Sequence, residues 1–129
     1  MRNPNPTPAE LEILTVLWQY GPATVRFVND EQNRKRRVGY TTTLKLMQIM
    51  TEKKLLGRKR ISRTHEYTPL VKQRDMQHLL VNKLLDSAFH GSPGEMVMEI
   101  LGHYRPDEQE RERIREYLDD LENKRHESH

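Results

Sequence analysis

The stretch from Gly39 to Lys54 has the clearest pattern of apolar and polar positions in the sequence. Its spacings of three and four residues predict a helix with one face toward a core, carrying Thr43, Leu46, Met47, Met50 and Lys54. The opposite face carries Thr41, Thr42, Lys45, Gln48 and Glu52. Hydroxyls, Lys and Gln are side chains that reach phosphates and base edges in a major groove. An ordinary amphipathic surface helix is the alternative that this stretch alone leaves open.

Two helices are predicted before this stretch. Thr7 can cap the first one, with Pro8 at its first position and Glu10 completing a capping box. Its apolar stripe consists of Leu11, Leu14, Leu17 and Trp18, and Gly21-Pro22 ends it. Residues 23–33 predict a short extended step and a second helix, with Thr24 as its cap and Val25 and Val28 facing inward.

A β-hairpin is predicted after Leu56. Arg58 and Arg60 alternate with Lys59 and Ile61, and the alternation resumes from His65 to Thr68 with Tyr67 facing inward. Residues 62–64 form the turn in this prediction, and Pro69 ends the second strand.

Three more helices follow. The first spans residues 72–89 and is broken by Gly91. Ser92 to Glu95 reads as a second capping box that opens a short apolar helix, Met96 to Leu101, closed by Gly102. The last helix begins at Pro106-Asp107 and turns Ile114, Leu118 and Leu121 inward. We expect the polar tail from Lys124 to His129 to be disordered.

The order helix, helix, helix, basic hairpin is that of a winged helix-turn-helix. The predicted fold is therefore mainly α with a small β wing. It has a DNA-binding winged domain in residues 1–71 and a helical dimerisation domain in residues 72–129. The later helices are too apolar on one side to be buried against so small a domain, although a bundle self-packed around the first domain is the alternative. The candidate dimerisation residues are Met76, Leu80, Leu84, Met96, Ile100, Leu101, Ile114, Leu118 and Leu121.

Charge is divided unevenly along the chain. Residues 1–71 hold 13 Lys and Arg against 6 Asp and Glu, a net charge of +7, whereas residues 72–129 hold 9 against 13, a net charge of −4. A basic front half indicates a module that binds a polyanion. The densest run, residues 34–37, is expected in a loop where it contacts phosphates, and a solvated basic turn is the alternative. The candidate DNA-binding residues from these patterns are Arg34, Lys35, Arg36, Arg37, Thr41, Thr42, Lys45, Gln48, Arg58, Arg60 and Arg63.

Composition narrows the remaining possibilities. The sequence has no cysteine, which excludes disulfides and thiolate chemistry. Its six histidines lack metal-site spacing, and neither a phosphate-binding glycine loop nor a nucleophile elbow occurs. We therefore expect no enzyme activity, no cofactor and no metal. With no long apolar run, we expect a soluble cytoplasmic protein that is not inserted in a membrane. Hydrophobic residues make up only 34% of the chain, which favours a core completed by dimerisation.

Several stretches together resemble the penicillinase and methicillin-resistance repressor family of bacterial transcription regulators. They are PAELEILTVLW (8–18), GPATVRFV (21–28), YTTTLKLMQIMTEKKLL (40–56), EYTPLV (66–71) and FHGSPGEMVMEIL (89–101). The resemblance covers nearly the whole chain in one register.

This resemblance implies a homodimer that represses by binding a palindromic promoter operator. It also implies release when a membrane sensor-peptidase signals cleavage in the dimerisation domain. It adds Tyr40 to the start of the recognition helix and aligns the family's cleavage site, Asn-Phe in classical members, with Gly102-His103. The chain departs from the family at Ile49, where Arg is common, and at Lys54, where Gly is usual. It also lacks the carboxy-terminal cysteines of the copper-responsive branch.

The sequence therefore predicts a dimeric DNA-binding repressor. The alternative is a winged-helix protein-interaction module that does not bind DNA. The basic surface separates the two hypotheses, because clustered cations serve no purpose toward a neutral partner.

Overall fold

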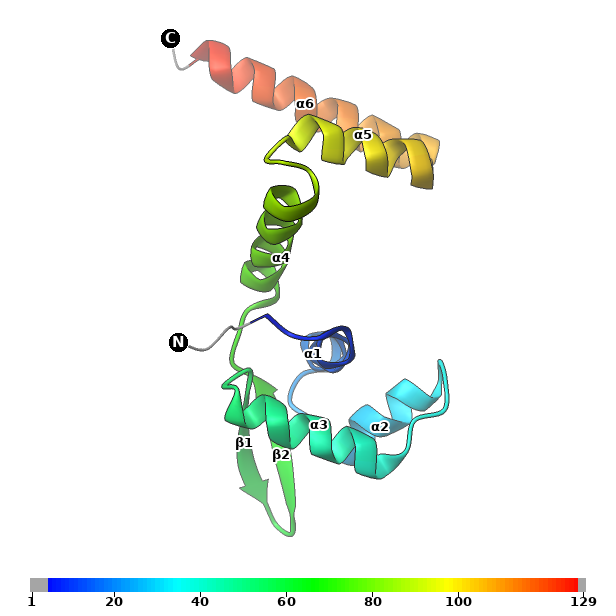
Figure 1. The fold of residues 1–129 in the computed structure, drawn as a ribbon, viewed down its shortest axis with the longest axis vertical. Helices are drawn as coiled ribbons and strands as arrows, with labels where there is room; N and C mark the ends of the chain where they lie inside the picture. Colours follow the sequence, from blue (N-terminus) through cyan, green and yellow to red (C-terminus); the bar gives the residue numbers. More distant parts are fainter. Residues whose placement is uncertain (1–4, 128–129) are drawn as a thin grey trace. The chain divides into compact units, whose positions relative to one another are not determined.

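The computed structural model describes residues 5–127, and in this range the chain forms six helices and one two-stranded sheet (Figure 1). The elements, in chain order, are α1 (Pro8–Tyr20), α2 (Val25–Asn33), α3 (Tyr40–Glu52), β1 (Leu56–Ile61), β2 (Thr64–Pro69), α4 (Gln73–Ala88), α5 (Pro93–Tyr104) and α6 (Glu108–Glu127). The chain divides into two compact units between Val81 and Asn82, inside α4. The fold is mainly α with a small β wing, as the sequence predicts.

The wing is an antiparallel hairpin. Its register runs from Leu56 opposite Pro69 to Ile61 opposite Thr64, so Ser62 and Arg63 form the turn. The free edge of β2 is extended by Ala23, which exchanges two backbone hydrogen bonds with Tyr67, of 3.1 and 2.8 Å. The extended step expected before α2 therefore attaches this helix to the wing.

The core of the first unit lies between α1, α2, α3, the wing and the start of α4. Tyr67 is buried there, which confirms that β2 turns this side chain inward. Trp18 packs at its edge and donates from Nε1 to the Val71 carbonyl at 3.0 Å. The buried hydrophobic residues are Ile13, Leu14, Leu17, Ala23, Val25, Val28, Met47, Met50, Leu55, Leu56, Tyr67 and Met76.

Helix boundaries in this unit follow the predicted caps. The Glu10 amide donates to Thr7 Oγ1 at 3.2 Å, and the Thr7 amide donates to Glu10 Oε1 at 2.9 Å, which completes the capping box. Thr24 Oγ1 accepts from the Phe27 amide at 3.2 Å at the start of α2. Gly21 ends α1 with φ of 89°, a conformation that glycine adopts at little cost.

Three local predictions are wrong. Lys54 does not belong to the buried stripe of α3, because the helix ends at Glu52 and Lys54 follows it, exposed, with φ of 65°. Gly102 does not close α5, which begins earlier, at Pro93, and continues to Tyr104. One exposed glycine costs a helix only about 1 kcal/mol, too little to end it. The tail expected to be disordered is helical through Glu127, and residues 128–129 lie outside the described part of the chain.

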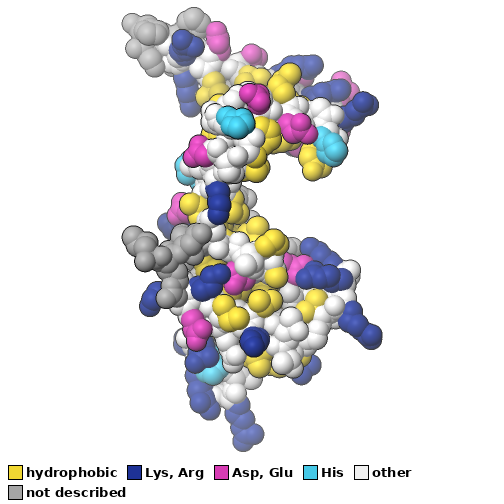
Figure 2. Space-filling view, viewed as in Figure 1, with side chains coloured by type: hydrophobic (Ala, Val, Ile, Leu, Met, Phe, Trp, Pro, Cys, Tyr) yellow, Lys and Arg dark blue, Asp and Glu magenta, His cyan; other side chains and the backbone are white. Residues whose placement is uncertain are grey.

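The second unit lacks buried side chains in its described part. From residue 82 to residue 125, every side chain is half-buried or exposed. Large apolar side chains of α5 and α6 are among the most exposed, including Met98 at 70%, Tyr104 at 75% and Leu118 at 58%. Figure 2 shows hydrophobic side chains on the surface of these helices. Among the described residues, no helix is both long enough and apolar enough to cross a membrane.

Candidate nucleic-acid interface

Helix α3 presents a polar face to solvent and an inner face to the core. Thr43, Met47 and Met50 are fully buried, with an exposed fraction of 0% each. The residues of the predicted outer face are all exposed: Thr41, Thr42, Lys45, Gln48 and Glu52. Tyr40, at the first position of the helix, is 44% exposed. The two faces expected from the sequence are therefore confirmed within the helix, except for Lys54, which lies beyond its end.

Two sets of side-chain contacts hold α3 in place. On its first turn, the buried Thr43 hydroxyl accepts from Asn29 Nδ2 at 2.9 Å and donates to Gln32 Oε1 at 2.6 Å. Just past its end, Lys53 Nζ lies 2.7 Å from Oε1 of the buried Glu10 at the start of α1. Both ends of the helix are thus fixed to other helices, and this limits how far its exposed face can shift.

The basic run before α3 lies in a loop, as expected, but its four cations differ in their contacts. Arg36 makes two hydrogen bonds to the carboxylate of Glu12, Nη1 to Oε2 at 2.5 Å and Nη2 to Oε1 at 3.0 Å. Arg34 Nη1 lies 3.4 Å from Glu31 Oε1 in an exposed pair. Lys35 and Arg37 are exposed. This hydrogen bond from Arg36 is the largest influence on Glu12 and lowers the pKa of its carboxyl below the ordinary value of 4.5.

The wing carries exposed cations along one strand and at its tip. Arg58, Lys59 and Arg60 lie on β1 and are exposed, and Arg63 is in the turn. Arg60 Nε donates to the Ser62 carbonyl at 3.1 Å, which holds this side chain along the turn. Figure 2 shows Lys and Arg side chains at the tip of the wing and around the loop between α2 and α3. Basic groups thus lie on both sides of α3.

Arg26, on the first turn of α2, lies beside the candidate interface, although the sequence patterns do not indicate it. Its guanidinium lies over the Tyr40 ring, 5.4 Å from the ring centroid. It lines a groove of about 550 Å³ together with Tyr40, Arg63 and His65. Arg26 stands alone in the sequence, with no neighbouring cation, so only the fold brings it beside the wing and the start of α3.

A sequence model of the penicillinase repressor family matches residues 6–120. The chain belongs to the penicillinase repressor family. Membership in a family of repressors supports DNA-binding transcription regulation as the function of this chain. It gives no positive evidence of catalysis. No curated protein matches the sequence.

Solved structures show the same fold for this penicillinase repressor family member. It resembles a MarR family protein from Bacillus stearothermophilus, with 18% identity, coverage of 92% of this chain and 74% of that chain, and a TM-score of 0.54. It also resembles a MarR protein from Peptoclostridium difficile, with 12% identity, coverage of 92% and 69%, and a TM-score of 0.51. At these identities the likeness establishes the winged-helix fold.

The residues predicted for dimerisation fall into two groups in this penicillinase repressor family member. Met76 is 3% exposed and belongs to the core of the first unit, and Leu80 packs against that core. The others lie in the second unit: Leu84, Met96, Ile100, Leu101, Ile114, Leu118 and Leu121. Leu84, Ile100, Leu118 and Leu121 are 46 to 58% exposed. Met96, Leu101 and Ile114 are half-buried.

The aligned cleavage pair Gly102-His103 lies in the last turn of α5, and both residues are exposed. Within residues 5–127, no three His, Cys, Asp or Glu side chains are grouped to hold a metal ion.

Proposed function

We propose that this penicillinase repressor family member is a homodimer that represses transcription by binding a palindromic promoter operator. The observation that carries the proposal is the exposed polar face of α3 between two basic segments. In this assignment α3 lies in the major groove, where Lys45 and Gln48 reach base edges and Tyr40, Thr41 and Thr42 meet bases or phosphates.

Phosphate contacts come from both sides of α3 in this proposal. The exposed Lys35 and Arg37 approach the backbone before the helix, with Arg34 beside them. Arg58, Arg60 and Arg63 of the wing approach it on the other side or enter the minor groove. Each phosphate contact releases counterions, so binding weakens steeply as salt is raised.

Self-association is assigned to residues 72–129. The absence of buried side chains from residue 82 to residue 125 supports it, because exposed apolar side chains of this size are stabilised by a partner. A two-fold dimer presents two copies of α3 to one face of the duplex, and its operator is then a palindrome.

A selection experiment tests DNA recognition directly. Purified protein is mixed with fragments of the host genome, and the bound fragments are sequenced. The proposal predicts one enriched motif with two-fold symmetry and half-sites on one face of the duplex. Recovery of fragments with no common motif would contradict specific operator binding.

Release of the operator is assigned to cleavage at Gly102-His103 after a membrane sensor-peptidase has signalled, or to another inducing event. The bond lies in a helical turn, whereas proteolysis favours exposed, unwound segments. Gly102 lowers the cost of unwinding this turn by about 1 kcal/mol relative to Ala.

A chain that ends at Gly102 imitates the cleaved form. It lacks α6 and should keep a folded winged unit with weak, salt-sensitive DNA binding. Loss of linked binding to two half-sites should lower operator affinity by roughly 10²–10⁴-fold. If this shortened chain dimerises and holds the operator as tightly as the full chain, cleavage here is not the switch.

A further inference from the structure

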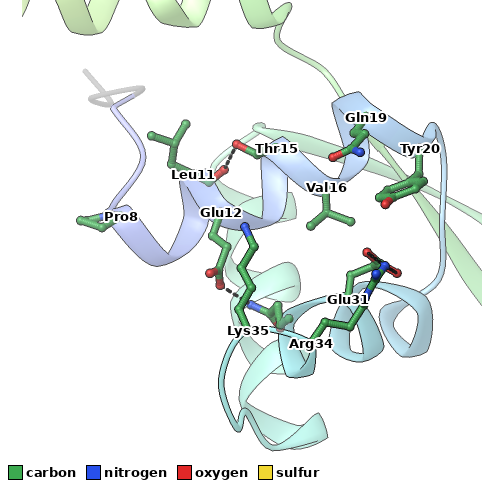
Figure 3. Close-up of a pocket in the computed structure, with 11 residues that line it drawn as sticks. Pro8, Leu11, Glu12, Thr15, Val16, Gln19, Tyr20, Glu31, Arg34 and Lys35 are labelled. Atoms are coloured by element: carbon green, nitrogen blue, oxygen red, sulfur yellow. Dashed lines mark hydrogen bonds and ion pairs between the residues drawn. The ribbon is translucent and has the colours of Figure 1, made fainter. Parts of the chain in front are cut away.

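A chain of side-chain hydrogen bonds runs from the buried face of α3 to α1. Asn29 Nδ2 donates to Thr43 Oγ1 at 2.9 Å, Thr43 donates to Gln32 Oε1 at 2.6 Å, and Gln32 Nε2 donates to Glu12 Oε1 at 3.0 Å. Every donor points the same way along this chain, and its last acceptor is the Glu12 carboxylate. Figure 3 shows Glu12 reaching from α1 toward α2, and a dashed line marks the hydrogen bond that Glu12 accepts from Gln32.

The same carboxylate also holds the basic loop. Arg36 approaches Glu12 with both terminal nitrogens, the fork geometry that makes Arg–carboxylate pairs strong and directional. The Glu12 side chain is half-buried, with 22% of its surface exposed, whereas 53% of the Arg36 side chain is exposed. Hydrogen bonds from Arg36 and Gln32 both lower the pKa of Glu12, so the carboxyl is ionised at neutral pH.

Arg36 differs from its neighbours in this respect. The pair of Arg34 with Glu31 is long, at 3.4 Å, and Arg34 is 72% exposed, so it is easily exchanged for a phosphate. To contact DNA, Arg36 would have to abandon two hydrogen bonds to a carboxylate that is also the final acceptor for Gln32.

We propose that Glu12 and Arg36 are positioning residues, which fix the loop and the buried face of α3 relative to α1, and that Arg36 does not bind phosphate. This inference rests on the proposed DNA-binding function. It assigns to Glu12 a role in operator recognition although α1 itself lies outside the proposed interface. The sequence predicts that Arg36 contacts DNA. In this proposal Arg36 instead contributes to specificity by fixing the position of the loop and of α3.

The first test compares Arg36→Ala with Arg37→Ala in the full chain. Affinity is measured by fluorescence anisotropy across a salt series, on a selected operator duplex and on a random-sequence duplex. Arg37→Ala should make the slope of log K against log salt on random DNA shallower by about 0.9, the value for one phosphate contact. Arg36→Ala should leave that slope unchanged and lower the operator-to-random affinity ratio about fivefold.

Arg36→Lys sharpens this comparison, because it keeps the charge and loses the two-pronged geometry. The proposal predicts the same loss of ratio as for Arg36→Ala. A shallower slope for Arg36→Ala, together with a normal ratio for Arg36→Lys, would overturn it.

The second test gives different salt slopes for the two roles of Arg36. Glu12→Gln releases Arg36, and the proposal predicts an operator-to-random ratio about fivefold lower with an unchanged salt slope. If Arg36 binds phosphate, the same variant should bind random DNA more tightly and with a steeper slope. Glu31→Gln is the matched control, because it removes the same charge and releases Arg34 without touching the hydrogen-bond chain. Its ratio should equal that of the unaltered protein.

The outcomes separate this inference from the proposed function. If the unaltered chain binds neither duplex, DNA binding itself fails. If it binds specifically and Glu12→Gln leaves the ratio unchanged, only the positioning role fails. Thermal unfolding of each variant shows whether it is folded at the assay temperature.

Discussion

The ion pair between Glu10 and Lys53 joins the start of α1 to the end of α3, and removing it should destabilise the winged unit. Lys53 Nζ lies 2.7 Å from Glu10 Oε1, and that oxygen also accepts the Thr7 amide at 2.9 Å. The Glu10 side chain is 3% exposed and that of Lys53 is 23% exposed. Lys53→Met keeps most of the side-chain volume. Of the two donors named here, only the Thr7 amide then remains for the Glu10 carboxylate.

The magnitude follows from this burial. Removing one partner of a fully buried pair costs about 3–5 kcal/mol, because a desolvated charge is left without its counterion. Since about a quarter of Lys53 is exposed and water reaches this side of the pair, we expect a smaller loss, of about 2–3 kcal/mol. A second variant, Glu10→Gln with Lys53→Met, removes the uncompensated charge and should regain at least about 1 kcal/mol of this loss.

Urea unfolding measures the loss of stability in Lys53→Met and the gain in the double variant. The protein concentration is kept fixed, because the stability of a dimer depends on it. The midpoint should fall for Lys53→Met without a change in slope. A loss below about 0.5 kcal/mol, the value of an exposed pair, would refute the reasoning. So would a double variant no more stable than Lys53→Met alone.

Four further predictions test other parts of the structure. Lys54→Gly should raise stability by about 1 kcal/mol, because Lys54 has φ of 65°; no gain in urea unfolding would contradict this strain. Gln48→Ala should cost about 1–3 kcal/mol on the selected operator and relax one base position; equal losses on operator and random DNA would remove Gln48 from the base contacts. Leu118→Ala with Leu121→Ala should weaken the dimer by about 4 kcal/mol, since each side chain has about half its surface left to bury in each of two copies. Sedimentation equilibrium measures this loss, and an unchanged dimer would place the interface elsewhere. Because the folded pKa of Glu12 lies below 4.5, its stabilisation is complete above that pH and is lost as pH falls through the folded pKa. Glu12→Gln should therefore flatten the pH dependence of urea unfolding on the acid side, and an unaltered dependence would contradict the lowered pKa.

Local patterns in the sequence predict the elements of the winged unit well. Thr7 and Thr24 cap α1 and α2, Tyr67 faces inward, and both faces of α3 follow from spacing alone except at Lys54, which lies beyond the end of the helix. These features depend on residues within one or two turns of each other, which is the range that periodicity and capping report.

Contacts between distant residues are what the sequence patterns miss. Glu10 and Lys53 are 43 positions apart, and Glu12 and Arg36 are 24 apart. The sequence assigns Glu10 to the cap of α1 and Arg36 to a phosphate contact, and it indicates neither residue's distant partner. The basic run therefore predicts four equivalent phosphate contacts, whereas in the structure Arg36 is paired with Glu12.

The end of α5 differs from the predicted one for another reason. Gly102 is a common helix terminator, but its cost in a helix is small, and the last turn continues to Tyr104 before Arg105 adopts φ of 42°. A residue other than glycine thus takes the left-handed position after the helix, which composition alone does not indicate.

The stoichiometry of the protein on one operator duplex tests the central claim most directly. Sedimentation velocity with a labelled selected operator should show two chains per duplex. Scrambling one half-site should lower affinity by roughly 10²-fold or more, because the gain from linked binding is lost. One chain per duplex, or full affinity with a single half-site, would contradict a dimeric repressor that reads a palindrome through two copies of α3.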